Sequence, residues 1–237
     1  MTRASTEHDR RIAAMFDRIA PRYDRLNRLL SFGTDVSWRR RTIALARLDG
    51  GERALDVGGG TGDLTIALLA ASPRSAAVVN VDLSAGMLAV YRRRAVARGL
   101  ADRAAAVIAS AETLPFPDAS VDRVLSGFTV RNIGDLPAAL REFRRVLRPG
   151  GRALILELSH PPAPAFAALY HLYFDRIAPR LAVLLGGDAE AYRYLPRSLG
   201  PFPGAEALAT MLAEAGFARV RFERFTLGIA ALHVAQT

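Results

Sequence analysis

The pattern of apolar positions divides the chain into helical and strand-like segments that alternate. Residues 7–47 carry apolar side chains at helical spacing, interrupted at Pro21 and Gly33. Apolar runs typical of strands follow at 53–57, 76–81, 104–108, 121–126, 152–157, 217–222 and 230–235. Helical patterns separate them at 63–70, 84–97, 135–147 and 205–214. This alternation predicts an α/β fold with a mostly parallel seven-stranded sheet and helices on both of its faces.

Two segments interrupt the alternation. The run Pro149-Gly150-Gly151 is predicted to end a helix and to turn into the fifth strand. Residues 160–203 form an insertion, apolar and aromatic in its first half and rich in Pro and Gly in its second. We expect this helical or loop insertion and an N-terminal helical cap, residues 1–47, to cover the carboxyl edge of the sheet. Both would belong to a single domain, residues 1–237.

A glycine-rich turn follows the first predicted strand. Asp56 lies near the end of that strand, Gly58, Gly60 and Gly62 come next, and a helical pattern starts at Leu64. Without a Cβ, the backbone can turn sharply and approach a ligand closely. Such a turn lies at the carboxyl edge of the sheet, where ligands bind in folds of this class. A purely structural turn is the alternative interpretation.

The spacing of the glycines indicates which ligand to expect. A dinucleotide fingerprint, G-x-G-x-x-G, would need its third glycine at Asp63 or Thr65, so both registers fail. The Asp63 carboxylate would also stand at a helix N-terminus, the place that otherwise stabilises a pyrophosphate. The pattern therefore favours a ligand without phosphate and with some positive charge, such as S-adenosylmethionine.

A second acidic residue supports this hypothesis. Asp82 closes the apolar run 76–81. It lies about 20 residues after the turn, the offset at which an acid binds ribose hydroxyls. The alternative is that Asp82 caps a helix that starts near Ser84.

Composition narrows the class of protein. The chain is 51% hydrophobic but has no run of about 18 apolar residues, so no transmembrane helix is expected. The stretch Glu7–Arg11 lacks the apolar core of a signal peptide, and the absence of cysteine excludes disulfides and thiolate chemistry. The four histidines have no metal-ligand spacing, so no metal is predicted. The expected location is the cytoplasm.

The chain is strongly basic, with a net charge of +9. Its arginine clusters lie in helical patterns and are interpreted as solvated helix faces: Arg39–Arg41, Arg92–Arg94 and Arg144-Arg145. The sequence carries no helix-turn-helix signature and no aromatic-glycine motif for single strands, so no nucleic-acid partner is predicted. Attraction to an anionic membrane surface is compatible with this charge.

Several segments resemble class I S-adenosylmethionine-dependent methyltransferases, a Rossmann-like α/β fold. They are Asp56–Gly62, Asp82, Ala111–Phe116 and Arg145–Gly151. More specific segments are similar to the menaquinone/ubiquinone-biosynthesis C-methyltransferase family. These are Met15–Asp24, Asn27, Ser31–Gly33, Trp38, Arg131-Asn132, Leu156–Ser159, Tyr192–Leu195, Pro203 and Ala230–His233. The resemblance extends over nearly the whole chain.

This resemblance implies C-methylation of a polyprenylated quinol ring. The expected substrate is demethylmenaquinol, and the methoxy-benzoquinol step of ubiquinone biosynthesis stays open. The family's cofactor-contacting positions correspond to Thr61, Asp82 and the pair Ser110-Ala111, in addition to the turn itself. The chain departs from the family at Ser110, where Asn or Asp is usual, and at Gly127, where Ser is frequent.

Methyl transfer to an aromatic carbon requires an activated ring. Arg131 cannot act as a base, because a guanidinium stays protonated, but it could stabilise a quinolate oxygen. Asn132 is expected to orient a hydroxyl or a water. Glu157 and His233 are candidate bases. The alternatives are that Glu157 pairs with an arginine and that His233 is structural.

The substrate's tail predicts an apolar tunnel under the lid. Its candidate lining is Phe16, Tyr23, Phe32, Trp38, Phe166, Tyr170 and Tyr173, although some of these aromatic residues could fill ordinary core. Peripheral contact with the inner face of the membrane would bring the enzyme to its substrate. A homodimer is compatible with the sequence.

Three other functions compete with this one. A nicotinamide-dependent oxidoreductase is disfavoured by the failed glycine register. A nucleic-acid-binding module with a methyltransferase-like fold is suggested only by the charge. A class I methyltransferase acting on another small molecule is the runner-up.

Overall fold

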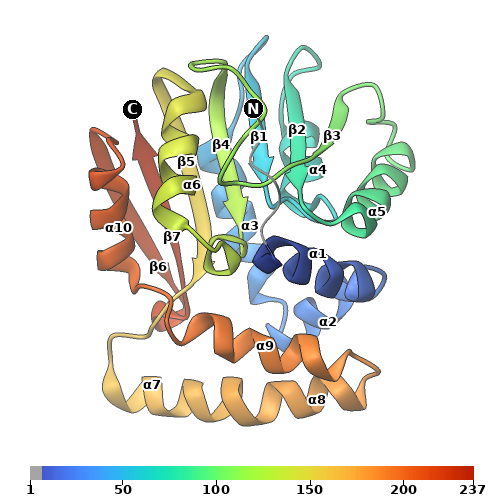
Figure 1. The fold of residues 1–237 in the computed structure, drawn as a ribbon, viewed down its shortest axis with the longest axis vertical. Coiled ribbons are helices and arrows are strands. Elements are labelled where there is room, and N and C mark those ends of the chain that lie inside the picture. Colours follow the sequence, from blue (N-terminus) through green and yellow to red (C-terminus); the bar gives the residue numbers. More distant parts are fainter. Residues whose placement is uncertain (1–6) are drawn as a thin grey trace.

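The computed structural model describes residues 7–237, and within them the strands form one seven-stranded sheet of order β3-β2-β1-β4-β5-β7-β6. The strands are β1 (Arg53–Val57), β2 (Ala77–Asp82), β3 (Ala104–Ile108), β4 (Val121–Gly127), β5 (Leu147–Leu158), β6 (Arg219–Phe225) and β7 (Ala230–Gln236). Strands β1 to β5 pair in parallel, and β7 runs antiparallel to both β5 and β6. The predicted mostly parallel sheet is confirmed (Figure 1).

Helices cover both faces of the sheet because neighbouring strand residues point to opposite sides. In β5, Ile155 packs in the cluster that holds residues of α6 (Leu136–Val146) and α10 (Ala205–Glu214). Its neighbour Leu154 packs in the cluster with α3 (Thr34–Ala46) and α4 (Asp63–Ala71). Helix α5 (Ala85–Val96) packs beside α4 and next to β3.

The remaining helices gather at the carboxyl edge of the parallel strands, at the bottom of Figure 1. They are α1 (Glu7–Ile19), α2 (Tyr23–Leu30), α7 (Pro164–His171), α8 (Ala178–Leu184) and α9 (Ala189–Leu199). The predicted breaks in the N-terminal region lie between these helices: Pro21 falls between α1 and α2, and Gly33, with φ +72°, precedes α3. Residues 160–203 are more helical than their Pro and Gly content indicated. A π-helical segment, η2 (Leu172–Ile177), joins α7 to α8.

The start of the fifth strand differs from the sequence prediction. Strand β5 begins at Leu147, which pairs with Val121, and the ladder resumes at Arg152. The run Pro149-Gly150-Gly151 is therefore an irregularity inside the strand, not a turn before it. No helix within residues 7–237 has the length and hydropathy needed to cross a membrane.

The arginine clusters are only partly solvated. Each cluster has at least one arginine that pairs with carboxylates. In the first, Arg39 lies near Asp35 and Asp63, and Arg41 pairs with Glu223. In the other two, Arg94 pairs with Asp24 and Asp63, and Arg145 with Glu142 and Asp118. Charge pairing of this kind is a tertiary property, because most of the paired carboxylates come from other elements.

Candidate active site

Two adjoining pockets open at the carboxyl edge of the sheet. The first, which we call the polar pocket, has an empty volume of about 870 Å³ including the solvent at its mouth. It is lined by the glycine turn (Gly58–Thr61), the end of β2 (Asp82, Leu83), Ser110–Glu112 and Gly127–Thr129, with Asp9, Phe16, Asp24, Asp63, Met87 and Asn132. The strand ends meet here because β1, β2 and β4 are parallel neighbours.

The three predicted glycines have three different roles in the turn. A Cβ on Gly58 would overlap Thr129 at 2.0 Å, and a Cβ on Gly62 would overlap the Tyr91 ring at 2.1 Å. A Cβ on Gly60 would meet no atom closer than 3.9 Å. Gly58 and Gly60 line the pocket and Gly62 does not. All three have positive φ, so Gly60 combines a glycine-only backbone with open space on the pocket side.

Asp82 holds the turn and faces the pocket. Its carboxylate accepts hydrogen bonds from the backbone N–H groups of Gly60 (2.9 Å) and Ser84 (2.8 Å). Ser84 itself caps α5, because its hydroxyl accepts from the N–H of Met87 at 3.0 Å. The cap is therefore Ser84, and the Asp82 carboxylate remains at the pocket wall. Burial raises the pKa of Asp82 to about 6.

Asp56 lies beneath the turn, outside the pocket lining. One of its carboxylate oxygens accepts from the backbone N–H (3.0 Å) and the hydroxyl (2.6 Å) of Thr65, in the first turn of α4. The side chain is fully buried, and burial raises its pKa to about 6. In this structure Asp56 anchors α4 to β1.

The other predicted cofactor positions, Thr61, Ser110 and Ala111, all line the polar pocket. The Thr61 hydroxyl donates to Asp24 at 2.7 Å. The Ser110 hydroxyl accepts from the backbone N–H of Glu112 at 3.3 Å. At Gly127 a Cβ would come within 2.7 Å of Leu64, so packing opposes a serine there.

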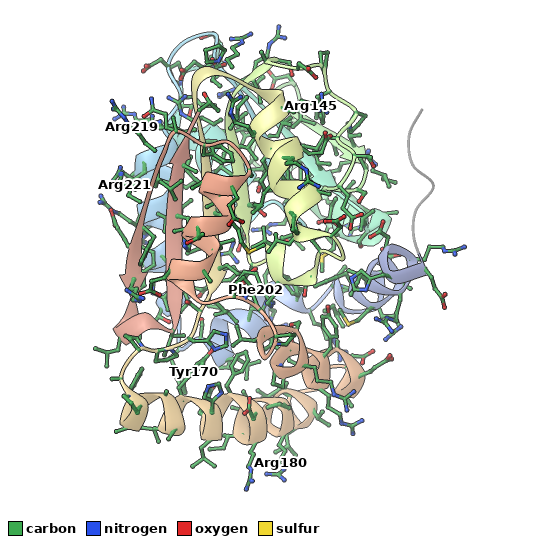
Figure 2. The ribbon with its side chains drawn as sticks, turned by 60° about the vertical axis from the view of Figure 1, so that its left-hand side comes forward. Arg145, Tyr170, Arg180, Phe202, Arg219 and Arg221 are labelled. Carbon is green, nitrogen blue, oxygen red and sulfur yellow. The ribbon has the colours of Figure 1, made fainter. Side chains whose placement is uncertain are left out.

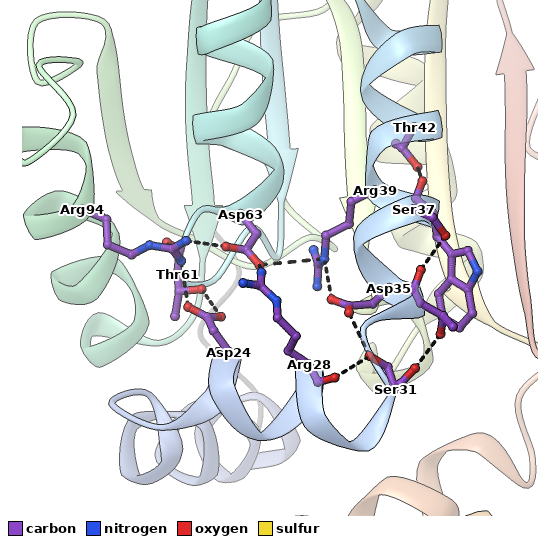
Figure 3. Close-up of polar contacts among 12 residues, drawn as sticks. Asp24, Arg28, Ser31, Asp35, Ser37, Arg39, Thr42, Thr61, Asp63 and Arg94 are labelled. Carbon is purple, nitrogen blue, oxygen red and sulfur yellow. Dashed lines mark hydrogen bonds and ion pairs between the residues drawn. The ribbon is translucent and has the colours of Figure 1, made fainter.

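A polar network that the sequence interpretation missed ties α2 to the turn (Figure 3). Asp24 of α2 accepts from Thr61 and from Arg94 of α5 (2.8 Å), and Arg94 also pairs with Asp63. Asp63 lies near Arg39 as well, and these guanidinium groups lower its pKa although burial acts to raise it. Asp24 lies within the resembling segment Met15–Asp24, but its partners are 37 to 70 residues away, which explains why no local pattern revealed them.

The second pocket, the apolar pocket, has an empty volume of about 960 Å³ and adjoins the first. Tyr23, Arg39 and Phe128 line both. The rest of its wall is mainly aromatic and aliphatic: Leu30, Phe32, Trp38, Leu158, Tyr170, Tyr173, Phe174, Ala178, Leu195 and Ile229. Of the aromatic residues expected in a tunnel, Phe16 lines the polar pocket instead and Phe166 lines neither of the two.

The charged groups of the apolar pocket are held firmly. Arg131 is 5% exposed and donates from Nη1 to a Glu157 oxygen at 2.6 Å and to the Phe128 carbonyl at 2.7 Å. Its Nε has no hydrogen-bond partner among residues 7–237. Burial acts to lower the pKa of Arg131, but the Glu157 carboxylate together with Tyr23 and Tyr194 outweighs burial, and the net shift of the pKa is upward. Arg39 stacks its guanidinium 4.9 Å from the Phe128 ring centre.

The four predicted catalytic residues do not meet at one of the two main pockets, although Arg131 and Asn132 both line a smaller cavity beside Tyr23. Arg131 lines the apolar pocket and Asn132 lines the polar one. The Asn132 Oδ1 is buried and finds no partner within residues 7–237. Glu157 lines neither pocket, and its two oxygens accept hydrogen bonds from Arg131 and from the N–H of Leu158.

His233 lies away from both pockets. It occupies the middle of β7, opposite Ile155 and Phe222, and is 1% exposed. Its Nε2 bonds to the Ala205 carbonyl at 2.8 Å, and burial lowers the pKa of the imidazole. The pleat of the sheet turns the His233 ring toward α10, although β7 lies next to β5 and its Glu157.

Comparisons with known proteins agree with this geometry. The sequence profile of the ubiE/COQ5 methyltransferase family matches residues 4–237. A demethylmenaquinone methyltransferase of Thermus thermophilus is 50% identical over 220 residues, which cover 93% of this chain and 98% of the relative. A ubiquinone/menaquinone biosynthesis C-methyltransferase of Geobacter sulfurreducens is 42% identical, covering 98% of this chain and 90% of the relative.

Among solved structures, a methyltransferase from Thermotoga maritima superposes with a TM-score of 0.68 at 18% identity, covering 94% of this chain and 98% of that one. The [4+2]-cyclase SpnF superposes with a TM-score of 0.71 at 21% identity, covering 95% and 94%. One of these two neighbours is a methyltransferase and the other a cyclase. At such identities the superpositions show the Rossmann-like methyltransferase fold alone.

Proposed function

The chain belongs to the ubiE/COQ5 methyltransferase family, and from this premise we propose that it methylates a ring carbon of demethylmenaquinol, with S-adenosylmethionine as methyl donor. The observation that carries this proposal is the contact between the polar and the apolar pocket at Tyr23, Arg39 and Phe128. A methyl donor in the first pocket and a quinol with an apolar tail in the second would meet at that junction.

The polar pocket fits the cofactor. Bound S-adenosylmethionine supplies an electrophilic methyl group on a positively charged sulfur. Asp82 presents a carboxylate suited to ribose hydroxyls, and Gly60 leaves open space on the pocket side. Arginines pair with Asp24 and Asp63, but the lining as a whole holds more carboxylates (Asp9, Asp24, Asp63, Asp82 and Glu112) than guanidinium groups (Arg39), and an acidic wall suits a cationic ligand. The unpartnered Oδ1 of Asn132 offers an acceptor to a ligand donor.

The apolar pocket fits a prenylated ring. Its mainly aromatic and aliphatic wall gives an isoprenoid chain apolar contacts on several sides. Trp38 is held in place there, because its indole N–H donates to the Thr226 hydroxyl at 3.1 Å. Holding the ring and the donor in one line is a large part of what such an enzyme must do.

Arg131 would stabilise the oxygen anion that activates the ring. Its guanidinium stays protonated and lies at the wall of the apolar pocket. Glu157 is its positioning residue, since both carboxylate oxygens are engaged by Arg131 and neighbouring backbone. A carboxylate held in this way is a poor candidate for accepting a substrate proton.

Tyr23 is a further group at the junction. Burial raises the pKa of its phenol, so the hydroxyl keeps its proton at neutral pH. Because Tyr23 lines both pockets, this hydroxyl could donate a hydrogen bond to a ring oxygen of the substrate. Asn132, next to Arg131 in the chain, would orient a substrate hydroxyl or a water from the side of the polar pocket.

The proposal includes where the enzyme works. It would act as a single methyltransferase domain, with α1–α3 and residues 160–203 as cap and lid, at the cytoplasmic face of a membrane that dissolves its substrate. The net charge of +9 suits contact with anionic lipids. The alternative is a homodimer, in which an apolar surface exposed by the lid binds a second copy of the chain instead of a membrane.

The direct test is a methylation assay with labelled S-adenosylmethionine and two quinols of equal prenyl length, demethylmenaquinol and a methoxy-benzoquinol analogue. We expect label in a ring carbon of demethylmenaquinol. Transfer to the benzoquinol alone would move the substrate assignment to ubiquinone biosynthesis. Cofactor binding without transfer to either quinol would favour another small-molecule substrate.

A further inference from the structure

The rod formed by α7, η2 and α8 exposes an unusual row of apolar side chains. It runs without a break from Pro164 to Leu184 along the lower edge of the molecule (Figure 1). Six large apolar residues of the rod and its end are between 44% and 83% exposed: Leu169, Leu172, Ile177, Val183, Leu184 and Leu185. A soluble protein rarely exposes so many apolar residues on one element without a use for them.

The rod has two distinct sides. Tyr170, Phe174 and Ala178 are buried and line the apolar pocket. Leu169, Leu172 and Arg176 follow one another at intervals of three and four residues and are exposed. Figure 2 shows Tyr170 on the side of the rod that faces the sheet and Arg180 projecting from the opposite side. The exposed row thus lies directly behind the wall of the proposed quinol pocket.

Two strained turns hold further apolar side chains in solvent near the same pocket. Phe32 is 77% exposed with φ +51°, and Leu227 is 70% exposed with φ +56°. Left-handed backbone is unfavourable for such side chains, so the fold stabilises an arrangement that local preference opposes. Phe32 lines the apolar pocket and contacts the Tyr173 ring at 5.6 Å, and Leu227 follows Thr226, which also lines it. These residues mark its rim.

The charge of the rod matches an anionic partner. Arg176 and Arg180 are exposed, while the one acidic residue of the rod, Asp175, lies 3.6 Å from His171. An outward face of Leu and Ile with interspersed arginines is typical of helices that lie in a membrane interface without crossing it. These charges also interrupt the rod's hydropathy, in keeping with the finding that no helix of residues 7–237 could span a bilayer.

We propose that this surface, which we call the rod face (Phe32, Leu169, Leu172, Arg176, Ile177, Arg180 and Leu184), docks on an anionic lipid bilayer and passes the isoprenoid tail of the quinol into the apolar pocket. The docking part of this proposal does not depend on which substrate the enzyme uses. The passage of the tail rests on the proposed function. A second copy of the chain fits this face less well. In a two-fold contact the same patch meets itself, so two surfaces that each carry Arg176 and Arg180 would be brought together with only Asp175 of each rod to offset them.

The test measures binding to phosphatidylcholine vesicles with and without phosphatidylglycerol, by co-sedimentation. One double variant, Leu172→Glu with Leu184→Glu, removes apolar contact, and another, Arg176→Glu with Arg180→Glu, removes charge. We expect the charge variant to lose at least about 30-fold in affinity for the anionic vesicles, because the loss of two arginines near such a surface has this effect and the new carboxylates add repulsion. The apolar variant should also lose affinity in both kinds of vesicle.

Matched controls come from α5, away from the rod. Val96→Glu changes a side chain that is 65% exposed and is compared with Leu184→Glu alone, so that each adds one carboxylate. Arg92→Glu with Arg93→Glu reverses two exposed charges and is compared with the double arginine variant of the rod. These controls should bind vesicles as the unchanged protein does. Equal losses in control and rod variants would mean that net charge alone attracts the protein, and would overturn the proposal.

Two further readouts separate the outcomes. The rod variants should methylate a short-tailed, water-soluble quinol at the normal rate but a long-tailed quinol in vesicles more slowly. Loss of a dimer in light scattering, with vesicle binding unchanged, would instead make the rod face an interface between copies. Vesicle binding through the rod face without methylation of any quinol would keep docking and reject the proposed function.

Discussion

The polar and the apolar pocket share three residues but are assembled in opposite ways. The polar pocket is built mainly from strand ends and the turns that follow them, such as Gly58–Thr61 and Asp82. The apolar pocket combines side chains from α2, α3, η2 and the turn before β7, elements separated by more than a hundred residues. The contrast shows that the ends of neighbouring parallel strands can specify most of a cofactor site, whereas a substrate site of this kind depends on how distant helices pack.

The largest expected effect concerns Gly60, where the polar pocket depends on backbone alone. Gly60→Val should abolish binding of S-adenosylmethionine, because the branched side chain would fill the pocket and oppose φ +54°. Isothermal calorimetry measures the affinity. Gly51→Val is the matched control, since Gly51 has φ +81° and no atom near its Cβ position. A folded Gly60→Val protein with near-normal affinity would remove the turn from the site.

The next effect concerns Arg131, at the apolar side. Arg131→Ala should lower kcat by about 100- to 1,000-fold, the usual loss for a preorganised electrostatic contact, while cofactor affinity stays nearly unchanged. It should also lower stability by about 3–5 kcal/mol, because the Glu157 carboxylate would be left buried and unpaired.

A second variant separates these two effects. Adding Glu157→Gln to Arg131→Ala removes the unpaired charge, so thermal stability should recover while turnover stays low. Arg131→Lys should restore only part of the rate, since an ammonium does not reproduce the planar fork. Turnover that returns together with stability would make Arg131 a structural residue only.

A smaller effect is expected at the wall of the polar pocket. Asp82→Ala should weaken cofactor binding by about 1.5–3 kcal/mol, the range for hydrogen bonds to a charged group. Ser84→Ala is the contrasting variant: it removes the cap of α5, costs about 1 kcal/mol of stability, and should leave affinity unchanged. If the two variants affect calorimetric affinity equally, the ribose role of Asp82 is wrong.

The raised pKa of Asp82 predicts how the affinity for S-adenosylmethionine depends on pH. Because its folded-state pKa is about 6, the carboxylate that receives ribose hydroxyls becomes protonated as the pH falls through that value. Affinity should therefore weaken below about pH 6. The free protein behaves oppositely: its stability falls as the pH rises from the unfolded value of 3.8 to about 6, because the folded chain holds its proton more tightly.

Calorimetry between roughly pH 5 and 8 shows which carboxylate causes this dependence. It compares the unchanged protein with Asp82→Asn. The variant should bind more weakly and lose most of the pH dependence. An unchanged slope in Asp82→Asn would assign the dependence to another carboxylate, with Asp56 the first to examine, since burial also raises its pKa to about 6.

The smallest effect is expected at the rim of the apolar pocket. Phe32→Ala should raise KM for a long-tailed quinol a few-fold and leave the affinity for S-adenosylmethionine unchanged, since Phe32 lines only the apolar pocket of the two. Stability should hardly change, because the ring is 77% exposed. An equal rise in KM for a tail-free quinol would show that Phe32 contacts the ring and not the tail.

Much of the fold and of the polar pocket was predictable from the sequence. The strand β1 and the breaks at Pro21 and Gly33 followed from apolar periodicity and from backbone rules that act within a few residues. The glycine turn and Asp82 were predictable because parallel strands bring their carboxyl ends to one edge. The insertion 160–203 was predicted only as helical or loop, and helices α7 to α9 were not placed within it, since Pro and Gly there hid an apolar pattern that tertiary packing stabilises.

What only the tertiary structure decided is which polar groups face the ligand. Asp56 and Asp82 both lie at or near the ends of neighbouring strands, yet Asp56 turns beneath the glycine turn to Thr65 while Asp82 stays at the pocket wall. Glu157 and His233 were candidate bases by residue type, but one pairs with Arg131 and the other packs under α10. The physical reason is that a side chain's direction in a sheet follows the pleat, and its partner comes from whichever distant element packs there. The sequence by itself determined the fold, the family and the kind of cofactor. The packing of distant elements determined how the charged side chains are arranged around the two pockets.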